Sequence, residues 1–284
     1  MKILVLGATG MAGHLISVYF KELGHDVIAF SRQKFEHAHH MIGDVTDFAF
    51  IEKTIKAENF DAIVNAIGLL NHHAEANPAQ AILLNSYLPH FLSHVTKEMK
   101  TKIIHMSTDC VFSGKSGSYL ETSFKDGETF YDRSKALGEL ENHKDLTFRN
   151  SIIGPDMKVA GIGLLNWFMK QKVAVSGFTH AIWTGVTTLT LAKAMSVALD
   201  ENLSGLYHLV NNETISKFEL LGLFNQHLRN NEIRIEPSDR LSVDKSLLNS
   251  RNDFSFLVPS YEEMIIEMKA WIDNHQYLYP HYFK

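Results

Sequence analysis

The sequence predicts an α/β protein, a doubly wound parallel sheet with a smaller, partly interleaved C-terminal lobe. Strand and helix patterns alternate over roughly the first half of the chain. The first strand, Lys2–Leu6, is apolar throughout, which is typical of a strand buried on both faces. Beyond about residue 150 the alternation loosens. We therefore expect a first domain over residues 1–155 and a lobe over 156–284, with some of its strands returning to the first sheet.

In the first half, short apolar runs are separated by stretches whose apolar residues recur at helical spacing. Parallel strands joined in this way require crossover helices on both faces of the sheet. The expected strands are Lys2–Leu6, 25–30, a strand ending at 43–45, 61–67 and Lys102–Met106, and the expected helices are 12–23, 46–57 and 79–99.

The second half contains four helical patterns and few clear strands. The aromatic C-terminus carries Tyr277, Tyr279, Tyr282 and Phe283, and we expect it to pack on the body or on another subunit. The expected helices are 164–172, 189–199, Lys217–Leu228 and 261–275, with a strand at 206–210.

Composition narrows the classes of function. The 284 residues carry a formal net charge of -5, which argues against general nucleic-acid binding. The one cysteine, Cys110, cannot form an internal disulfide or a thiolate zinc cluster. No apolar run is long enough for a membrane helix, and no signal peptide is evident. We expect a cytoplasmic monomer or homodimer that binds neither nucleic acid nor membrane.

Residues 7–13 read GATGMAG, directly after the first strand and at the start of the first helix. Glycines there permit a tight turn and close approach of the backbone to a pyrophosphate at the helix N-terminus. In this strand–helix context the motif predicts a Rossmann dinucleotide site. The cofactor contacts expected from it are Gly7, Thr9, Gly10, Met11, Ala12 and Gly13.

The end of the second expected strand indicates which dinucleotide is used. An acidic residue there would bind the ribose of NAD, whereas an Arg accommodates the 2′-phosphate of NADP. Ser31 and Arg32 therefore favour NADPH, and NADH stays possible. Asp44, followed by Val45, can accept a hydrogen bond from the adenine amino group.

Tyr131 and Lys135 stand four residues apart in a helical pattern, YDRSKALGE, so both lie on one helix face. A tyrosine titrates near pH 10, and a neighbouring ammonium favours its ionised form. Thr108, after the strand Lys102–Met106, supplies a hydroxyl that can hold a substrate carbonyl. These three residues are the expected catalytic group.

The motifs together resemble an extended short-chain dehydrogenase/reductase of the dTDP-4-dehydrorhamnose reductase-like branch. The resemblance covers about half the chain. It rests on GATGMAG (7–13), NAIG (65–68), Asn85, STDCVFSG (107–114), YDRSKALGE (131–139), RNSIIGP (149–155) and, more weakly, IWTGVTTLTLAKAM (182–195).

The resemblance implies NADPH-dependent reduction of the C4 ketone of a nucleotide-linked 4-keto-6-deoxysugar, in surface polysaccharide synthesis. Tyr131 would give the proton, Lys135 would hold the nicotinamide ribose, and Thr108 would bind the ketone oxygen. The resemblance further implies cofactor contacts at Ala66, Ile67, Gly68, Asn85, Tyr131 and Lys135, and sugar-nucleotide contacts at Asp109, Cys110, His180, Trp183, Lys245 and Arg251.

The chain departs from the family pattern at Asp132, where the family has glycine, and at Cys110, where it has tyrosine. Cys110 lies two positions after Thr108, as in GDP-fucose synthases, so a combined epimerase/reductase is a second interpretation. A 4,6-dehydratase would need an Asp-Glu pair where Asp109 precedes Cys110, and is set aside.

Loss of catalysis would give a third interpretation, an NADP-binding regulatory subunit, which the presence of Thr108, Tyr131 and Lys135 disfavours. No metal is expected. The histidines that could suggest one are interpreted as solvated loop residues: His37, His39, His40, His72 and His73.

Overall fold

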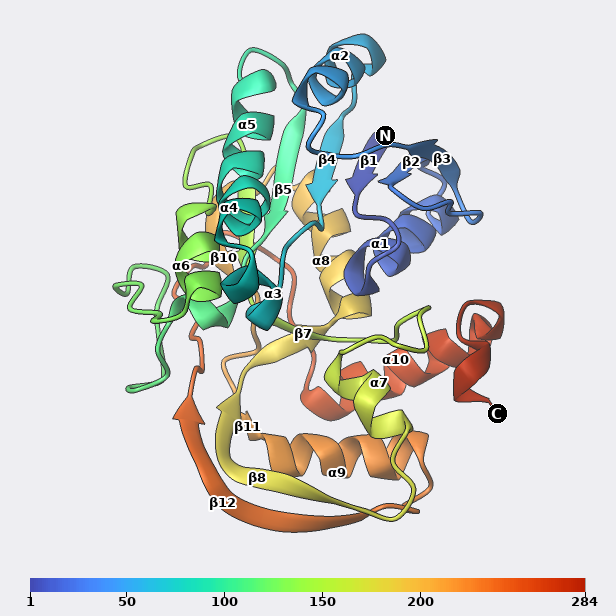
Figure 1. Ribbon diagram of the computed structural model, residues 1–284, viewed down its shortest axis with the longest axis vertical. Coiled ribbons are helices and arrows are strands. Elements are labelled where there is room, and N and C mark those ends of the chain that lie inside the picture. The colour runs from blue at the N-terminus through green and yellow to red at the C-terminus, as the bar shows by residue number, and fades with distance from the viewer. Residues whose placement is uncertain (284) are drawn as a thin grey trace.

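The computed structural model describes residues 1–283, and Lys284, the last residue of the expected lobe, lies outside them. The core is a seven-stranded sheet in the order β10-β6-β5-β4-β1-β2-β3, with every neighbouring pair parallel (Figure 1). The predicted doubly wound sheet is confirmed. Its strands are β1 Lys2–Leu6, β2 Asp26–Ser31, β3 His39–Ile42, β4 Ala62–Asn65, β5 Lys102–Met106, β6 Leu146–Arg149 and β10 Gly205–His208.

Alternate residues of each strand point to opposite faces of the sheet, and in the buried strands both sets are apolar. Helices therefore cover both faces. In β1, Ile3 and Val5 belong to one apolar cluster, whereas Leu4 and Leu6 belong to another. The first cluster is closed by α1 (Met11–Glu22), α8 (Thr188–Asp200) and α10 (Tyr261–Asn274), and the second by α2 (Phe48–Glu58) and α5 (Leu88–Val95).

The helix expected over 79–99 is not uniform. It runs as α4 (Pro78–Ala81), a π-helical segment η1 (Ile82–Tyr87) and α5, and it ends at Val95. The Thr96 hydroxyl donates to the carbonyl of Leu92, which satisfies an end carbonyl and leaves 97–99 outside the helix. Single π turns occur often at functional sites, and this one carries Asn85.

Part of the second half forms a separate layer below the sheet in Figure 1, whereas α8 and β10 lie with the sheet. Two long parallel strands, β8 (Ala174–Trp183) and β12 (Arg234–Asp244), pair with each other, and β11 (Ile215–Ser216) joins β8. Helix α9 (Lys217–Leu228) packs on β8, and α7 (Leu164–Met169) packs on α9. Short strands β7 (Ser151–Ile153) and β9 (Gly185–Thr187) pair between the layers, and β10 returns to the main sheet.

The aromatic C-terminus packs on the body of the same chain. Tyr279 is buried, and its hydroxyl contacts His14 Nε2 at 2.8 Å and Trp271 Nε1 at 3.0 Å. His14 Nδ1 lies 2.9 Å from the carbonyl of Gly10, so the tail supports the glycine loop from behind. Two short turns complete the tail, η3 (Gln276–Leu278) and η4 (Pro280–Tyr282).

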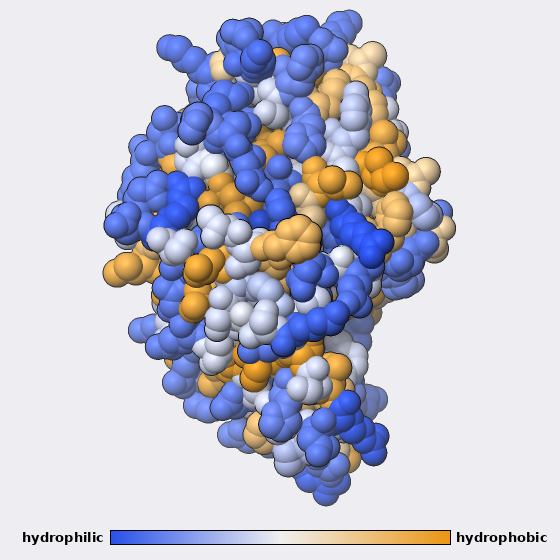
Figure 2. Space-filling view, turned by 90° about the vertical axis from the view of Figure 1, so that its left-hand side faces the viewer, coloured by the Kyte–Doolittle hydropathy of each residue, from blue (hydrophilic) through white to orange (hydrophobic). Residues whose placement is uncertain are grey.

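The face that lies on the left in Figure 1 is largely hydrophilic, with hydrophobic patches that polar side chains interrupt (Figure 2). Within residues 1–283, no helix has the length and apolar character needed to cross a membrane.

Candidate active site

The glycine loop forms the first wall of the site. Gly7 has a φ of 86°, and its amide donates to the carbonyl of Phe30 at 2.9 Å. A Cβ on Gly13 would lie 2.2 Å from the Gly7 carbonyl oxygen, so any larger residue there would push α1 away from β1. The loop therefore holds the N-terminus of α1 close to the sheet, where a phosphate can bind.

A cleft of about 620 Å³ opens beside this loop, at the carboxyl ends of β1, β2, β3 and β4. Met11, Ala12 and Gly13 lie in the first turn of α1 and not on the cleft wall. Predicted residues that line the cleft are Gly7, Thr9, Gly10, Ser31, Arg32, Asp44, Val45, Ala66, Ile67 and Gly68. Other lining residues are Phe30, Gln33, Gly43, Thr46, Leu69, Gln80, Leu84 and Lys158.

Two predicted cofactor residues use their side chains inside the protein. The Ser31 hydroxyl donates to the carbonyl of Gln33 at 2.6 Å and lies 3.1 Å from His40 Nε2. Asn85 is fully buried, accepts from the amide of Leu69, and donates to the Leu69 carbonyl and to Ser134. Asn85 thus ties the cleft wall to the helix that carries Ser134, and its side chain is not on the cleft surface.

Thr108 follows β5, at the start of a short turn, η2 (Asp109–Val111). Its hydroxyl donates to Asp109 Oδ1 and accepts from the amide of Cys110, both at 3.1 Å. The Thr108 hydroxyl also lies close enough to the Tyr131 phenol to lower the Tyr131 pKa. The structure therefore brings together two of the three predicted catalytic side chains.

Tyr131 and Lys135 lie on α6 (Phe130–Leu137), and both are buried. The helix begins with a capping box in which Thr129 and Asp132 hydrogen-bond to each other's backbone amides at 3.1 Å. Asp132, which replaces the family's glycine, therefore fixes the first turn that carries Tyr131.

Burial is the largest influence on the pKa values of both Tyr131 and Lys135. Burial raises the Tyr131 pKa above its ordinary value, and Cys110 raises it further. The Lys135 ammonium donates to the carbonyl of Met106 at 2.6 Å, and burial lowers its own pKa to about 8. The largest influences on the Tyr131 pKa are burial, Cys110 and Thr108, so the effect of Lys135 on this phenol stays a prediction.

Next to Thr108, burial raises the pKa of two acidic side chains, Asp109 and Cys110. Burial raises the pKa of the Asp109 carboxyl, although the ammonium groups of Lys217 and Lys245 oppose this shift. Burial, together with the neighbouring Asp109, raises the pKa of the Cys110 thiol to about 12. A thiolate base is therefore disfavoured at this position near neutral pH.

Two side chains of the lobe, Trp183 and Lys217, lie close to each other, and Lys217 lies near Asp109. Trp183 is buried, and its indole N–H has no hydrogen-bond partner within residues 1–283. Lys217, the first residue of α9, lies 4.6 Å from the Trp183 ring centroid, and burial lowers its pKa to about 8. Lys217 was not predicted from the sequence, because no motif surrounds it and its position depends on how the lobe packs.

Other predicted substrate residues are not in this group. His180 is exposed on β8, where it pairs in register with Ser242. Arg251 forms an ion pair with Asp253 and donates to the carbonyls of Ser204 and Leu206. These carbonyls flank the start of β10, an edge strand that lies two strands from β5. The assignment of Arg251 to the substrate diphosphate stays a prediction.

Three other basic residues of the lobe have local partners or lie on its surface. Arg229 donates to the carbonyls of Met169 and Gln171, Arg234 pairs with Glu236, and Arg240 lies on exposed β12. Lys245 lowers the pKa of both Asp109 and Cys110, which places it near the turn after β5.

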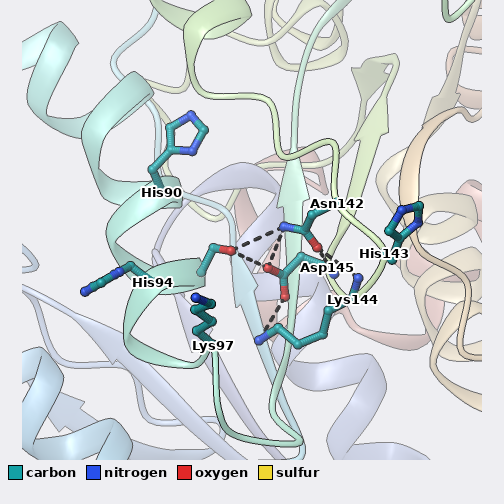
Figure 3. Close-up of a pocket in the computed structure, with 8 residues that line it drawn as sticks. His90, His94, Lys97, Asn142, His143, Lys144 and Asp145 are labelled. Carbon is teal, nitrogen blue, oxygen red and sulfur yellow. Dashed lines mark hydrogen bonds and ion pairs between the residues drawn. The ribbon is translucent and has the colours of Figure 1, made fainter.

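A second pocket, of about 520 Å³, lies beside α5 and the start of β6 (Figure 3). It is bordered by α5 and by the loop before β6. Ser93 and Asn142 both donate to Asp145, and Lys144 donates to the carbonyl of Thr96, so these groups close the sheet edge. The residues drawn there are His90, Ser93, His94, Lys97, Asn142, His143, Lys144 and Asp145.

Throughout 1–283, no group of three or more histidine, cysteine or acidic side chains is arranged to hold a metal. His40 is not a solvated loop residue as expected, because it contacts Ser31 and accepts from the amide of Phe35. His72 and His73 are exposed.

Comparisons with known proteins agree with this geometry. A family model described as the RmlD substrate binding domain matches residues 1–154. The dTDP-4-dehydrorhamnose reductase of Escherichia coli (strain K12) is 30% identical over 240 residues, covering 81% of this chain and 79% of that protein. The spore coat polysaccharide biosynthesis protein SpsK of Bacillus subtilis is 27% identical over 228 residues, covering 77% and 76%.

Among solved structures, the dTDP-4-dehydrorhamnose reductase of Bacillus anthracis in complex with NADP superposes with a TM-score of 0.80 at 19% identity, covering 95% of this chain and all of that one. That likeness establishes the fold, and the matches in sequence establish the family. The chain belongs to the RmlD family of extended short-chain dehydrogenases/reductases, and it is an NAD(P)-dependent oxidoreductase acting on a sugar nucleotide.

Proposed function

We propose that this enzyme reduces the C4 ketone of a nucleotide-linked 4-keto-6-deoxysugar, with NADPH as the donor, in the synthesis of a surface polysaccharide. The observation that carries the proposal is the buried pair of Tyr131 and Lys135 on α6, with the Thr108 hydroxyl close enough to the phenol to lower the Tyr131 pKa. The names of the relatives support dTDP as the nucleotide and a polysaccharide as the product's destination.

The residues of the cleft fit a dinucleotide. The close approach of Gly13 to Gly7 leaves α1 with free amides at its N-terminus, where Gly10 is extended and no side chain caps the helix. Arg32 is exposed at the end of β2, and Lys158 reaches the same cleft from the lobe. Both cations suit the phosphates of NADPH. When bound, the cofactor supplies the hydride.

The protein's own residues would bind and protonate the ketone. The Thr108 hydroxyl and the Tyr131 phenol would both donate to the ketone oxygen, and Tyr131 would transfer its proton as the alcohol forms. The raised pKa of Tyr131 suits this direction of reaction, since it keeps the phenol protonated until it is needed. Lys135 holds its position through the Met106 carbonyl.

The most direct test of substrate class is thermal stability with a panel of ligands. In the presence of NADPH, dTDP-, UDP- and GDP-linked sugars would be compared, because a ligand that binds only the folded state raises Tm by mass action. We expect the largest rise with a dTDP-sugar. A panel in which no nucleotide sugar changes Tm would contradict the proposal.

Arg32→Ala should lower the preference for NADPH over NADH, because the exposed guanidinium at the end of β2 is lost. A hydrogen bond to a charged group contributes about 1.5–3 kcal/mol, so the ratio of kcat/KM values should fall by about tenfold or more. Arg133→Ala, on α6 outside the cleft lining, is the control. An unchanged ratio in Arg32→Ala would remove this residue from the cofactor site.

Lys217→Met should raise KM for the sugar nucleotide by about tenfold, because an ammonium facing Asp109 and Cys110 would be lost from the substrate side. The Met side chain keeps most of the packing on Trp183. Lys193→Met is the control, since Lys193 pairs with Glu267 on the body. A KM equal to that of the control would show that Lys217 serves packing alone.

Cys110→Ser separates simple reduction from epimerisation with reduction. With the thiol pKa raised to about 12, we expect wild type to place no solvent deuterium at sugar C3 or C5. The serine variant should retain reduction within a few-fold. Deuterium incorporation by wild type that disappears in Cys110→Ser would instead establish the thiol as an epimerising base.

A further inference from the structure

A line of buried polar groups runs behind the catalytic lysine. His105, on β5, is fully buried, and its Nε2 lies 3.4 Å from Lys135 Nζ. Its Nδ1 lies 3.2 Å from Nδ2 of Asn65, the residue paired with it on β4. Asn65 Oδ1 in turn accepts a hydrogen bond from the backbone amide of Ile67, at 3.2 Å. Ile67 lines the dinucleotide cleft.

These contacts define the tautomer of His105. Because Asn65 Oδ1 is used by the Ile67 amide, the Asn65 side chain turns its NH₂ group toward the ring. An amide nitrogen can only donate, so His105 Nδ1 must accept and carries no proton. Burial lowers the His105 pKa well below its ordinary value, and the charge on Lys135 and the His90 ring act in the same direction. The ring is therefore neutral, with its one proton on Nε2.

An Nε2–H group then points at Lys135 Nζ. If Lys135 is an ammonium, two hydrogen-bond donors face each other and no bond forms. If Lys135 is a neutral amine, the Nε2–H group donates to the lone pair of Nζ. The other charged group near Lys135 is Glu139, which favours the ammonium. Glu139 is already paired with Arg149 and Lys125. Burial of Lys135 acts in the same direction as the histidine and lowers the lysine pKa to about 8.

We propose that Asn65 and His105 are positioning residues that hold an Nε2–H donor against Lys135 and so stabilise its neutral amine. Through this contact the two residues set the pH at which Lys135 loses its charge. The role of that charge in turnover rests on the function proposed above, but the tautomer itself does not. The arrangement also links the lysine to Ile67 on the cleft wall.

The test is the tautomer of His105 in the free protein, read from the ¹⁵N shifts of its two ring nitrogens with ¹⁵N-histidine labelling. We expect Nε2 protonated and Nδ1 bare across pH 6–8. A ring with Nδ1 protonated and Nε2 bare, or with both nitrogens protonated, overturns the proposal without any variant or activity measurement.

Asn65→Leu removes the amide donor without adding charge. The ring can then present an unprotonated Nε2 to the ammonium, so the pKa of ¹⁵Nζ-labelled Lys135 should rise by about one unit. The high-pH limb of the kcat profile should move to higher pH by the same amount. Asn225→Leu is the matched control, because Asn225 is also buried and its side chain also makes two hydrogen bonds, both of them to the backbone of Ile233. Equal Lys135 titrations in the two variants overturn the proposal.

The two levels of failure can be told apart. A protein that reduces no sugar nucleotide, yet shows the expected tautomer and Lys135 shift, contradicts only the proposed function. An active reductase whose His105 carries its proton on Nδ1 contradicts only this inference.

Discussion

Tyr131→Phe should lower kcat for reduction of the 4-keto sugar by about 10²- to 10⁴-fold, the usual contribution of a positioned general acid. The phenol is buried near the Thr108 hydroxyl, so removal of its own hydroxyl deletes the proton donor with little change in shape. The rate would be followed by loss of NADPH absorbance in single-turnover and steady-state experiments.

NADPH affinity, measured by fluorescence, should stay within a few-fold of wild type in the same variant. Tyr277→Phe is the matched control, because its ring lies in the C-terminal tail and is 60% exposed. Turnover by Tyr131→Phe close to that of Tyr277→Phe would mean that another group protonates the ketone.

Glu139→Ala should destabilise the protein by about 3–5 kcal/mol, since it leaves Arg149 buried without its counter-ion. Both side chains are fully buried, and Arg149 donates to Glu139 from Nε at 2.7 Å and from Nη2 at 2.6 Å. Ser107 also donates to Glu139 at 2.6 Å, so the strand end that carries Thr108 would loosen. Urea unfolding would measure the loss of stability, and kcat should fall with it.

The pH dependence of stability provides a further check on this pair. Burial alone would raise the Glu139 pKa, but Arg149 and Lys125 lower it overall. A carboxylate with a lowered pKa stabilises the fold above its ordinary value of 4.5 and loses this contribution as pH falls below it. Wild type should therefore lose more stability on acidification than Glu139→Ala.

Glu141→Ala is the matched control, because Glu141 contacts the same Lys125 but is mostly exposed. Its change in stability should stay within about 0.5 kcal/mol. An equal effect of the two substitutions would show that the ion pair between Glu139 and Arg149 does not stabilise the end of β6.

The parts of the site that lie in contiguous motifs could be predicted from the sequence. Tyr131 and Lys135 share a helix face by spacing alone, and Thr108 follows a strand whose apolar run is clear. The loop from Gly7 to Gly13 is likewise local. Each of these needs only one strand or helix to be recognised correctly.

Parts that depend on packing between distant segments were not predicted. β12 is mostly exposed and contains Pro237, as an edge strand can, so it lacks the apolar alternation that identifies a strand. Lys217 reaches Trp183 only because α9 packs on β8. His105 looked like one polar residue in an apolar strand, and its partners come from another strand and from α6.

Arg251 shows how local partners can engage a cation. The family resemblance assigned it to a diphosphate, whereas in the structure Asp253, two residues later, pairs with it. The carbonyls of Ser204 and Leu206 take the remaining donors. A sequence shows that a cation is present but not which neighbouring anion or carbonyl the fold brings to it.

The most direct test of the central claim follows the hydride. The enzyme would be incubated with a dTDP-4-keto-6-deoxysugar and NADPH deuterated at both C4 positions, and the product examined by NMR and mass spectrometry. The account predicts one deuterium at sugar C4 with wild type and almost none on the same timescale with Tyr131→Phe. A product without deuterium at C4, or equal transfer by the two proteins, would contradict it.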